Sequence, residues 1–255
     1  MVDPPARSLP GERSTSWAIV LAAGSGSRFG GAKQFTAVAG QRLVDLAVRS
    51  ATSACDHVVL VVPSGHRWDG PPVDVVVPGG SDRPASVRCG LAAIPTTAEV
   101  IVVHQAANPM ASPAMFTALI AAVRAGAPAA VPGLRPSDVV RRAVDGLAGE
   151  LLGRDELILV QTPAAFQGQV LRAAHALAVP AQEDTALVSA AGYPIHLVPG
   201  DPRNIHVTTP EDLELVRALL VAESVGSPAG ADGDDRQDAA DDHEQHTSGT
   251  GDRGP

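Results

Sequence analysis

Two cations follow a glycine-rich loop near the start of the chain. The apolar run 18–22 has the length and the β-branched content of a buried strand. Gly24 and Gly26 come next, and glycines let backbone N–H groups approach an anion closely. Arg28 and Lys33 then supply positive charge, which indicates a polyphosphate ligand. A plain strand-to-helix turn would explain the glycines but not the two cations.

This loop differs from the two common phosphate-binding loops. The dinucleotide pattern G-x-G-x-x-G would need a glycine where Phe29 stands. The G-K-[ST] ending of a P-loop is also absent. The residues therefore indicate phosphate binding of another kind.

A second candidate site lies in the stretch 79–91, G-G-S-D-R-P-A-S-V-R-C-G-L. Its glycine pair precedes a helix that Ser81 or Asp82 could cap. Arg83 and Ser86, near the start of this helix, could present donors to a nucleotide. The alternative is a capped helix with an exposed arginine and a packed serine, and the residues alone favour that alternative.

Apolar runs alternate with helical patterns along most of the chain. Near-continuous apolar runs of this kind belong to a parallel sheet that helices cover on both faces. With 255 residues, 45% of them hydrophobic, the chain can form one large α/β domain. We expect strands at 18–22, 57–63, 73–77, 100–104, 128–132 and 195–198, and helices near 41–54, 112–124, 167–178, 182–191 and from Pro210 onward.

Composition excludes several other classes of protein. No apolar run approaches the roughly 18 residues of a membrane helix. Residues 1–16 lack the apolar centre of a signal peptide, so we expect a flexible N-terminus, a cytoplasmic protein and no membrane partner. Cys55 and Cys89 have no CxxC partner, which favours buried free thiols over zinc or a disulfide.

The acidic charge is concentrated at the end of the chain. Segment 223–255 holds nine acids and two arginines, a net −7 of the total −9, which leaves −2 for the rest. The body is therefore close to neutral and carries no sign of nucleic-acid binding. The segment has almost no apolar residues, and we predict that it is a disordered tail.

Three motifs together resemble one known family. The stretch L-A-A-G-S-G-S-R-F-G…K-Q-F, the G-G-x-x-R-x-x-S-V-x-x-G-L pattern and N-I-H-V-T-T-P-E-D-L are similar to the 2-C-methyl-D-erythritol 4-phosphate cytidylyltransferases of the non-mevalonate isoprenoid pathway. The resemblance covers about residues 17–222. It implies a three-layer α/β/α, Rossmann-like nucleotidyltransferase domain of the glycosyltransferase-A type. It also implies transfer of CMP from CTP to a polyol phosphate, with release of pyrophosphate.

The resemblance assigns a role to each matching position. Catalytic charge would come from Arg28, Lys33 and His206. The implied nucleotide-binding residues are Ala22, Ala23, Gly24, Ser25, Gly26, Gly80, Arg83, Ser86 and Gln105, and the implied acceptor-binding residues are Arg154, Thr162, Val139 and Asn108.

Four of these positions depart from the family pattern. The family reads H-D-A-A-R-P where this chain has H-Q-A-A-N-P, so Gln105 replaces the aspartate that binds Mg²⁺ and Asn108 replaces an arginine. Val139 stands for a threonine and His206 for a lysine. A neutral amide is a weaker Mg²⁺ ligand than a carboxylate, so no metal ligand is certain. Two hypotheses stay open: an active cytidylyltransferase, or a catalytically impaired or redirected paralogue that binds nucleotide or a partner.

Two further features follow from the resemblance. Residues 133–160 match an arm through which the family dimerises, and we therefore expect a homodimer. Glu183 and Asp184 preserve two acids found in the family. They fit equally well a helix N-terminus, which favours negative charge, and a functional role.

Overall fold

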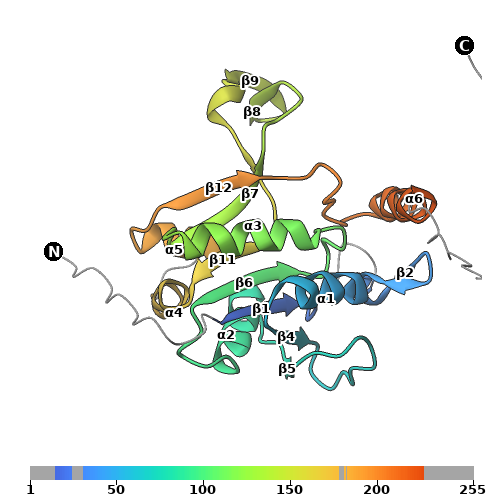
Figure 1. The fold of residues 1–255 in the computed structure, drawn as a ribbon. Helices are drawn as coiled ribbons and strands as arrows, with labels where there is room; N and C mark the ends of the chain where they lie inside the picture. The colour runs from blue at the N-terminus through green and yellow to red at the C-terminus, as the bar shows by residue number, and fades with distance from the viewer. Residues whose placement is uncertain (1–14, 25–30, 178–180, 182, 227–255) are drawn as a thin grey trace, which may run out of the picture.

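A mostly parallel sheet with helices on both faces forms the body of the protein (Figure 1). The computed structural model describes residues 15–24, 31–177, 181 and 183–226. Ser25, Gly26, Arg28 and the segments 1–14 and 227–255 lie outside the described residues. The sheet order is β10-β7-β11-β6-β1-β4-β5, with β12 paired to β7. The strands are β1 (Ser16–Leu21), β4 (His57–Val62), β5 (Val75–Pro78), β6 (Val100–Gln105), β7 (Ala129–Leu134), β10 (Leu159–Val160), β11 (Ala164–Gln167) and β12 (Ile195–Pro199).

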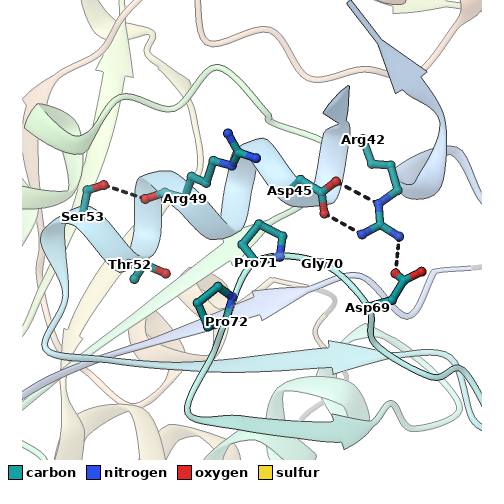
Figure 2. A pocket seen from close by; sticks show the side chains of 9 residues that line it. All are labelled: Arg42, Asp45, Arg49, Thr52, Ser53, Asp69, Gly70, Pro71 and Pro72. Carbon is teal, nitrogen blue, oxygen red and sulfur yellow. Dashed lines mark hydrogen bonds and ion pairs between the residues drawn. The ribbon is translucent and has the colours of Figure 1, made fainter. Parts of the chain in front are cut away.

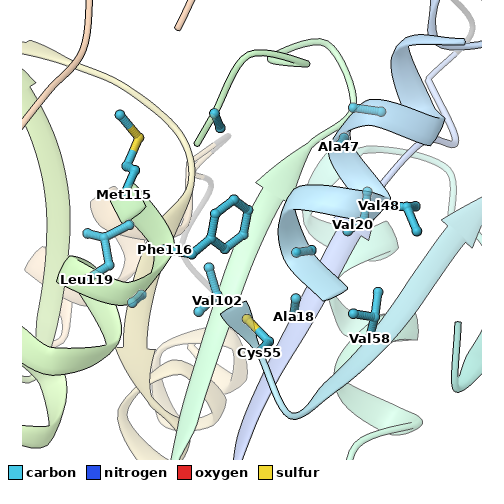
Figure 3. Close-up of a cluster of buried hydrophobic side chains, with 14 of the residues drawn as sticks. Ala18, Val20, Ala47, Val48, Cys55, Val58, Val102, Met115, Phe116 and Leu119 are labelled. Carbon is cyan, nitrogen blue, oxygen red and sulfur yellow. The ribbon is translucent and has the colours of Figure 1, made fainter. Parts of the chain in front are cut away.

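Strand periodicity divides the core into two layers. In β1, Ala18 and Val20 belong to one buried cluster, and Trp17 and Ile19 to the other. The first cluster packs against α1 (Leu43–Ala54) and α3 (Pro113–Arg124), and Phe116 lies near its centre (Figure 3). The second cluster packs against α2 (Arg83–Ala92), α4 (Gly168–Ala176) and α5 (Asp184–Ala190). The predicted α/β fold with a covered sheet is therefore confirmed.

Strand β11 gives the sheet an antiparallel element that the sequence patterns did not reveal. It lies between β6 and β7 and runs antiparallel to both. Helix α4 begins directly after it, at Gly168. A Cβ at Gly168 would lie 2.1 Å from the carbonyl oxygen of Ala98, so only glycine allows this approach.

The segment predicted as an arm contains an ordered hairpin. Strands β8 (Val140–Val144) and β9 (Leu147–Leu152) pair with each other and stand apart from the main sheet (Figure 1). Asp145 and Gly146 connect them with φ angles of 48° and 79°. An Asp-Gly pair with both residues in the left-handed backbone conformation forms the turn that a two-residue hairpin loop requires. The hairpin lies within the predicted arm 133–160, and the Asp-Gly pair is the sequence signal that marks its turn.

The last helix closes the end of the domain. Helix α6 (Pro210–Gly226) continues past residue 222, where the predicted domain ends. Its Val216 is buried with Val38, Leu43 and Val207, beside the hairpin of β2 (Ala37–Val38) and β3 (Gln41–Arg42). The Asp212 carboxylate accepts the Thr208 and Thr209 N–H groups at 2.7 and 2.8 Å, which caps the helix.

None of the described helices combines the length and the apolar character that crossing a bilayer requires.

His104 on β6 is fully buried, and we expect it to lower the free energy of unfolding in acid. Burial lowers the pKa of His104 to about 3, from the ordinary value of 6.5. The unfolded chain therefore binds a proton below about pH 6.5 that the folded chain refuses, and this favours unfolding as the pH falls. The slope is at most about 1.4 kcal/mol per pH unit.

We expect the variant His104→Leu to lose less stability than the wild type between about pH 6.5 and about pH 5. Urea unfolding at both pH values measures the difference. The contribution of the carboxylates to the pH dependence is the same in both proteins and therefore cancels in the comparison. Equal losses in the two proteins would mean that His104 is not the group that titrates.

Candidate active site

Five of the predicted site residues line one cavity at the edge where the parallel strands end, whereas the described residues of the first loop, Gly80 and Ser86 lie outside its lining. The cavity has a volume of about 520 Å³. Residues following β6, preceding β11 and following β12 all line it, because the antiparallel β11 starts at the same edge where the others finish. The predicted site residues in its wall are Arg83, Gln105, Asn108, Thr162 and His206.

The first loop leaves β1 with its backbone fixed by a glutamine. The Gln34 side chain is 4% exposed and donates to the carbonyl oxygens of Ala22 and Gly24 at 2.7 and 2.8 Å. In a trans peptide the C=O and the N–H of one unit point in opposite directions. The Ala23 N–H therefore points away from Gln34, the direction required for binding an anion on the other side. The sequence analysis gave no role to Gln34.

The second motif packs directly against the first. A Cβ on Gly79 would lie 2.3 Å from the Cβ of Ala23 and 3.0 Å from the Ser86 hydroxyl, so the glycine lets the two motifs touch. The Gly80 N–H donates to the buried Ser86 hydroxyl at 3.1 Å. Of the two caps considered for α2, Asp82 is the one used, since its carboxylate accepts the Ala85 N–H at 2.7 Å.

Lys33 joins the first loop to the segment that carries His206. The Lys33 ammonium donates to the Val207 carbonyl at 2.5 Å, and the Val207 N–H donates to the Ala107 carbonyl at 2.8 Å. Ala107 lies beside Asn108 in the turn after β6. Lys33, the turn after β6 and the segment that carries His206 are far apart in the chain, and these two hydrogen bonds hold them together.

Amide side chains line the end of the cavity that would receive the acceptor. Asn204 is 3% exposed and donates to the Thr162 carbonyl at 2.8 Å, which fixes its orientation. Its oxygen faces the Asn108 amide nitrogen at 3.4 Å. Gln161 donates to the carbonyls of Asp201 and Asn204 at 2.8 and 3.1 Å. Neutral amides therefore hold the turn after β12 against β11, and sequence reasoning missed Gln161 and Asn204.

Two predicted acceptor-binding residues do not line the cavity of the single chain. Val139 precedes β8 and is 67% exposed. Arg154 lies in a short helical turn (Arg154–Glu156) and donates to the Ser137 carbonyl at 2.8 Å. Both belong to the arm, so they can contact an acceptor only if the arm lies against a cavity, in this chain or in a second copy.

The donor set of the cavity does not suit a protein-held Mg²⁺ ion. A hard cation prefers carboxylates, but the residue at the end of β6 is the amide Gln105. The acids in the wall, Glu183 and Asp184, both pair with Arg83. No group of three or more His, Cys, Asp or Glu that could hold a metal occurs in the part of the chain that the structure describes.

A larger hollow lies on the outside of α1, where Arg42, Asp45 and Asp69 pair with one another (Figure 2). It has a volume of about 720 Å³. Arg42 bonds Asp45 at 2.8 and 2.9 Å and Asp69 at 2.6 Å, and its guanidinium lies 5.1 Å from the Trp68 ring. No residue of the three motifs lines this hollow. The smaller cavity is therefore the candidate active site.

A glycine-rich loop, a glycine pair at a capped helix and a cavity at the strand ends fit an α/β nucleotide-binding domain. The family model of 2-C-methyl-D-erythritol 4-phosphate cytidylyltransferase (IspD) matches residues 17–222. The chain belongs to this family.

Individual relatives agree with this assignment. The chain is 42% identical over 218 residues to the 2-C-methyl-D-erythritol 4-phosphate cytidylyltransferase of Nocardia farcinica (strain IFM 10152), which covers 80% of this chain and 93% of that protein. It is 36% identical to the bifunctional enzyme IspD/IspF of Nitratidesulfovibrio vulgaris (strain DP4) and spans 58% of that protein. The crystal structure of 2-C-methyl-D-erythritol 4-phosphate cytidylyltransferase from Thermus thermophilus superposes with a TM-score of 0.71 at 30% identity, covering 80% of this chain and 98% of that one.

Gln34 provides a test of how the first loop is held. The variant Gln34→Glu keeps the shape but cannot donate to the carbonyls of Ala22 and Gly24. We expect it to lose about 1–3 kcal/mol of stability and to bind a nucleoside triphosphate about tenfold more weakly.

Thermal unfolding and calorimetry measure the two effects. Gln167→Glu is the matched control, since Gln167 donates to the Gly126 carbonyl at 3.3 Å on the exposed surface. The control should leave triphosphate binding unchanged. Full triphosphate affinity in folded Gln34→Glu would contradict the assigned role.

Proposed function

We propose that this protein transfers CMP from CTP to 2-C-methyl-D-erythritol 4-phosphate and releases pyrophosphate. The observation that carries the proposal is that residues of the second and third family motifs line one cavity, while the first motif contacts both of them through Ala23 and Lys33. The family match over residues 17–222 supports the same reaction. The alternative is an impaired or redirected paralogue. The comparisons do not favour it over the active enzyme.

The reaction requires positioning and charge rather than a covalent intermediate. A phosphate oxygen of the acceptor attacks the α-phosphorus of CTP, the bond to the bridging oxygen of the β-phosphate breaks, and pyrophosphate leaves with that electron pair. The protein holds the two substrates in line and offsets the charge that develops on the phosphates. Every residue role below follows from one of these two tasks.

The nucleotide roles fall on the first two motifs. We propose that the backbone of residues 22–26 cradles the triphosphate and that Gly80 and Ser86 contact cytosine. The support is the close packing of Gly79 between Ala23 and Ser86, which places both surfaces side by side. Arg28 and Lys33 would stabilise the charge on the phosphates, and Lys33 already lies beside the segment that carries His206.

The acceptor roles fall on the other end of the cavity. We propose that Thr162, Asn108 and His206 face the acceptor, since all three line the wall. Gln105 and Asn108 contribute hydrogen bonds there instead of charge. Positive charge near the acceptor phosphate would then come from Arg83, which also lines the wall, and from His206 when protonated.

We propose a homodimer in which the arm reaches a second copy. The hairpin stands apart from the sheet and exposes apolar side chains: Val139 is 67% exposed, Leu147 73% and Leu151 58%. A partner that covers this surface would remove it from water. Arg154 and Val139 would then approach the acceptor of the partner copy. The cytoplasmic location, and the lack of membrane or nucleic-acid partners, stay predictions from the sequence.

A pyrophosphate-release assay tests the reaction directly. We expect release with CTP and 2-C-methyl-D-erythritol 4-phosphate together, and much less with ATP or GTP. The variant Lys33→Ala should lower turnover by about ten- to a hundredfold, since a charge-assisted phosphate contact is worth about 1.5–3 kcal/mol. Release that does not depend on the acceptor, or is equal with all nucleotides, would contradict the proposal.

Gln105 bears on the Mg²⁺ that the family resemblance implies. We expect the variant Gln105→Asp to reach half-maximal activity at lower Mg²⁺ than the wild type, because a carboxylate ligates a hard cation better than an amide. A Mg²⁺ titration of turnover measures this. An identical Mg²⁺ midpoint in Gln105→Asp and wild type would mean that no metal binds at this position.

A further inference from the structure

Three side chains from three elements meet behind the wall of the cavity. Asp184, at the start of α5, is 2% exposed. One of its oxygens accepts from the Arg83 Nη2 at 2.7 Å, and the other lies 2.8 Å from the His175 Nε2. His175 comes from the last turn of α4 and its side chain is 3% exposed. Arg83 itself lines the cavity.

The carboxylate of Asp184 is not explained by the helix it begins. Helix α5 has seven residues, and Glu183 at its N-cap makes no side-chain cap hydrogen bond. Both Asp184 oxygens point instead to residues of other elements, 9 and 101 positions away in the chain. A favourable position for negative charge at a helix N-terminus therefore does not explain the contacts of Asp184.

Burial makes these contacts strong and orienting. Burial alone would raise the pKa of Asp184, but the hydrogen bond from His175 and the charge of Arg83 outweigh it and lower the pKa below its ordinary value. Asp184 is thus an anion inside the protein, and such an anion needs fixed partners. The His175 Nε2 carries the proton of this contact, because its partner is a carboxylate. The pair forms a rigid support for one guanidinium nitrogen.

We propose that Asp184, supported by His175, is a positioning residue that fixes Arg83 at the cavity wall to contact a phosphate oxygen of CTP or of the acceptor. A guanidinium has only donors and matches the geometry of phosphate oxygens. An arginine fixed before binding loses less side-chain entropy when the substrate arrives. The proposal rests on the proposed nucleotidyl transfer, and the test below separates the two.

The chain contains its own control for this proposal. Glu183 contacts the same Arg83 Nη2 at 3.3 Å, but its side chain is 59% exposed. Exposed ion pairs contribute little because water and salt screen them. Glu183→Gln and Asp184→Asn therefore remove the same charge from the same nitrogen, one at the surface and one in the interior.

Steady-state kinetics with both substrates tests the role. We expect Asp184→Asn to raise the KM of one substrate about tenfold, which corresponds to the loss of one charge-assisted contact. The substrate affected, CTP or the acceptor, identifies the phosphate that Arg83 contacts. His175→Asn should shift the same KM by less, and Glu183→Gln should shift it less than Asp184→Asn does, because water screens the exposed Glu183 contact with Arg83.

A double-mutant cycle separates positioning from general stability. In an Arg83→Ala background, Asp184→Asn should have no further effect on KM, since the group that it positions is already gone. An equal KM effect with and without Arg83, or a fall in melting temperature with both KM values unchanged, would overturn the proposal. If the wild type shows no transfer, the proposed function fails, and the same cycle read by calorimetry of CTP and acceptor binding still decides the positioning.

Discussion

The active-site cavity depends on one junction, at Val207. Its carbonyl accepts the Lys33 ammonium at 2.5 Å and its N–H donates to Ala107 at 2.8 Å, while its side chain is fully buried under α6. The turn before α6 therefore cannot move without disturbing the first loop and the turn after β6. Helix α6, which carries no predicted catalytic residue, fixes His206 through this junction.

Local patterns in the sequence predict most of the scaffold. The runs at 57–63 and 100–104 form β4 and β6 because continuous apolar residues suit a sheet covered on both faces. Asp82 caps α2 as its residue type predicts. Gln105 and His206 lie in one wall because the ends of parallel strands meet at the same edge, and Thr162 joins them because the antiparallel β11 begins at that edge.

The remaining features come from contacts that no local pattern marks. Gln34 has no local signal that distinguishes it from a surface residue, yet it is buried and holds the backbone carbonyls of Ala22 and Gly24. Asp184 and Arg83 meet across 101 residues, and Asn108 and Asn204 across 96. Strand β11 is too short for its pattern to distinguish it from a turn. The neutral residues Gln105 and Asn108 were predicted as departures from the family, and in the structure they line the same cavity as the amides Gln161 and Asn204.

A crystal structure of the protein with CTP tests the central claim, that chemistry takes place where the three motifs converge. The account predicts that the triphosphate lies against the backbone of Ala22–Gly24, that the base contacts Gly80 and Ser86, and that the α-phosphate faces the wall formed by Gln105 and His206. Density for the nucleotide in the hollow over α1, beside Arg42 and Arg49, would contradict it.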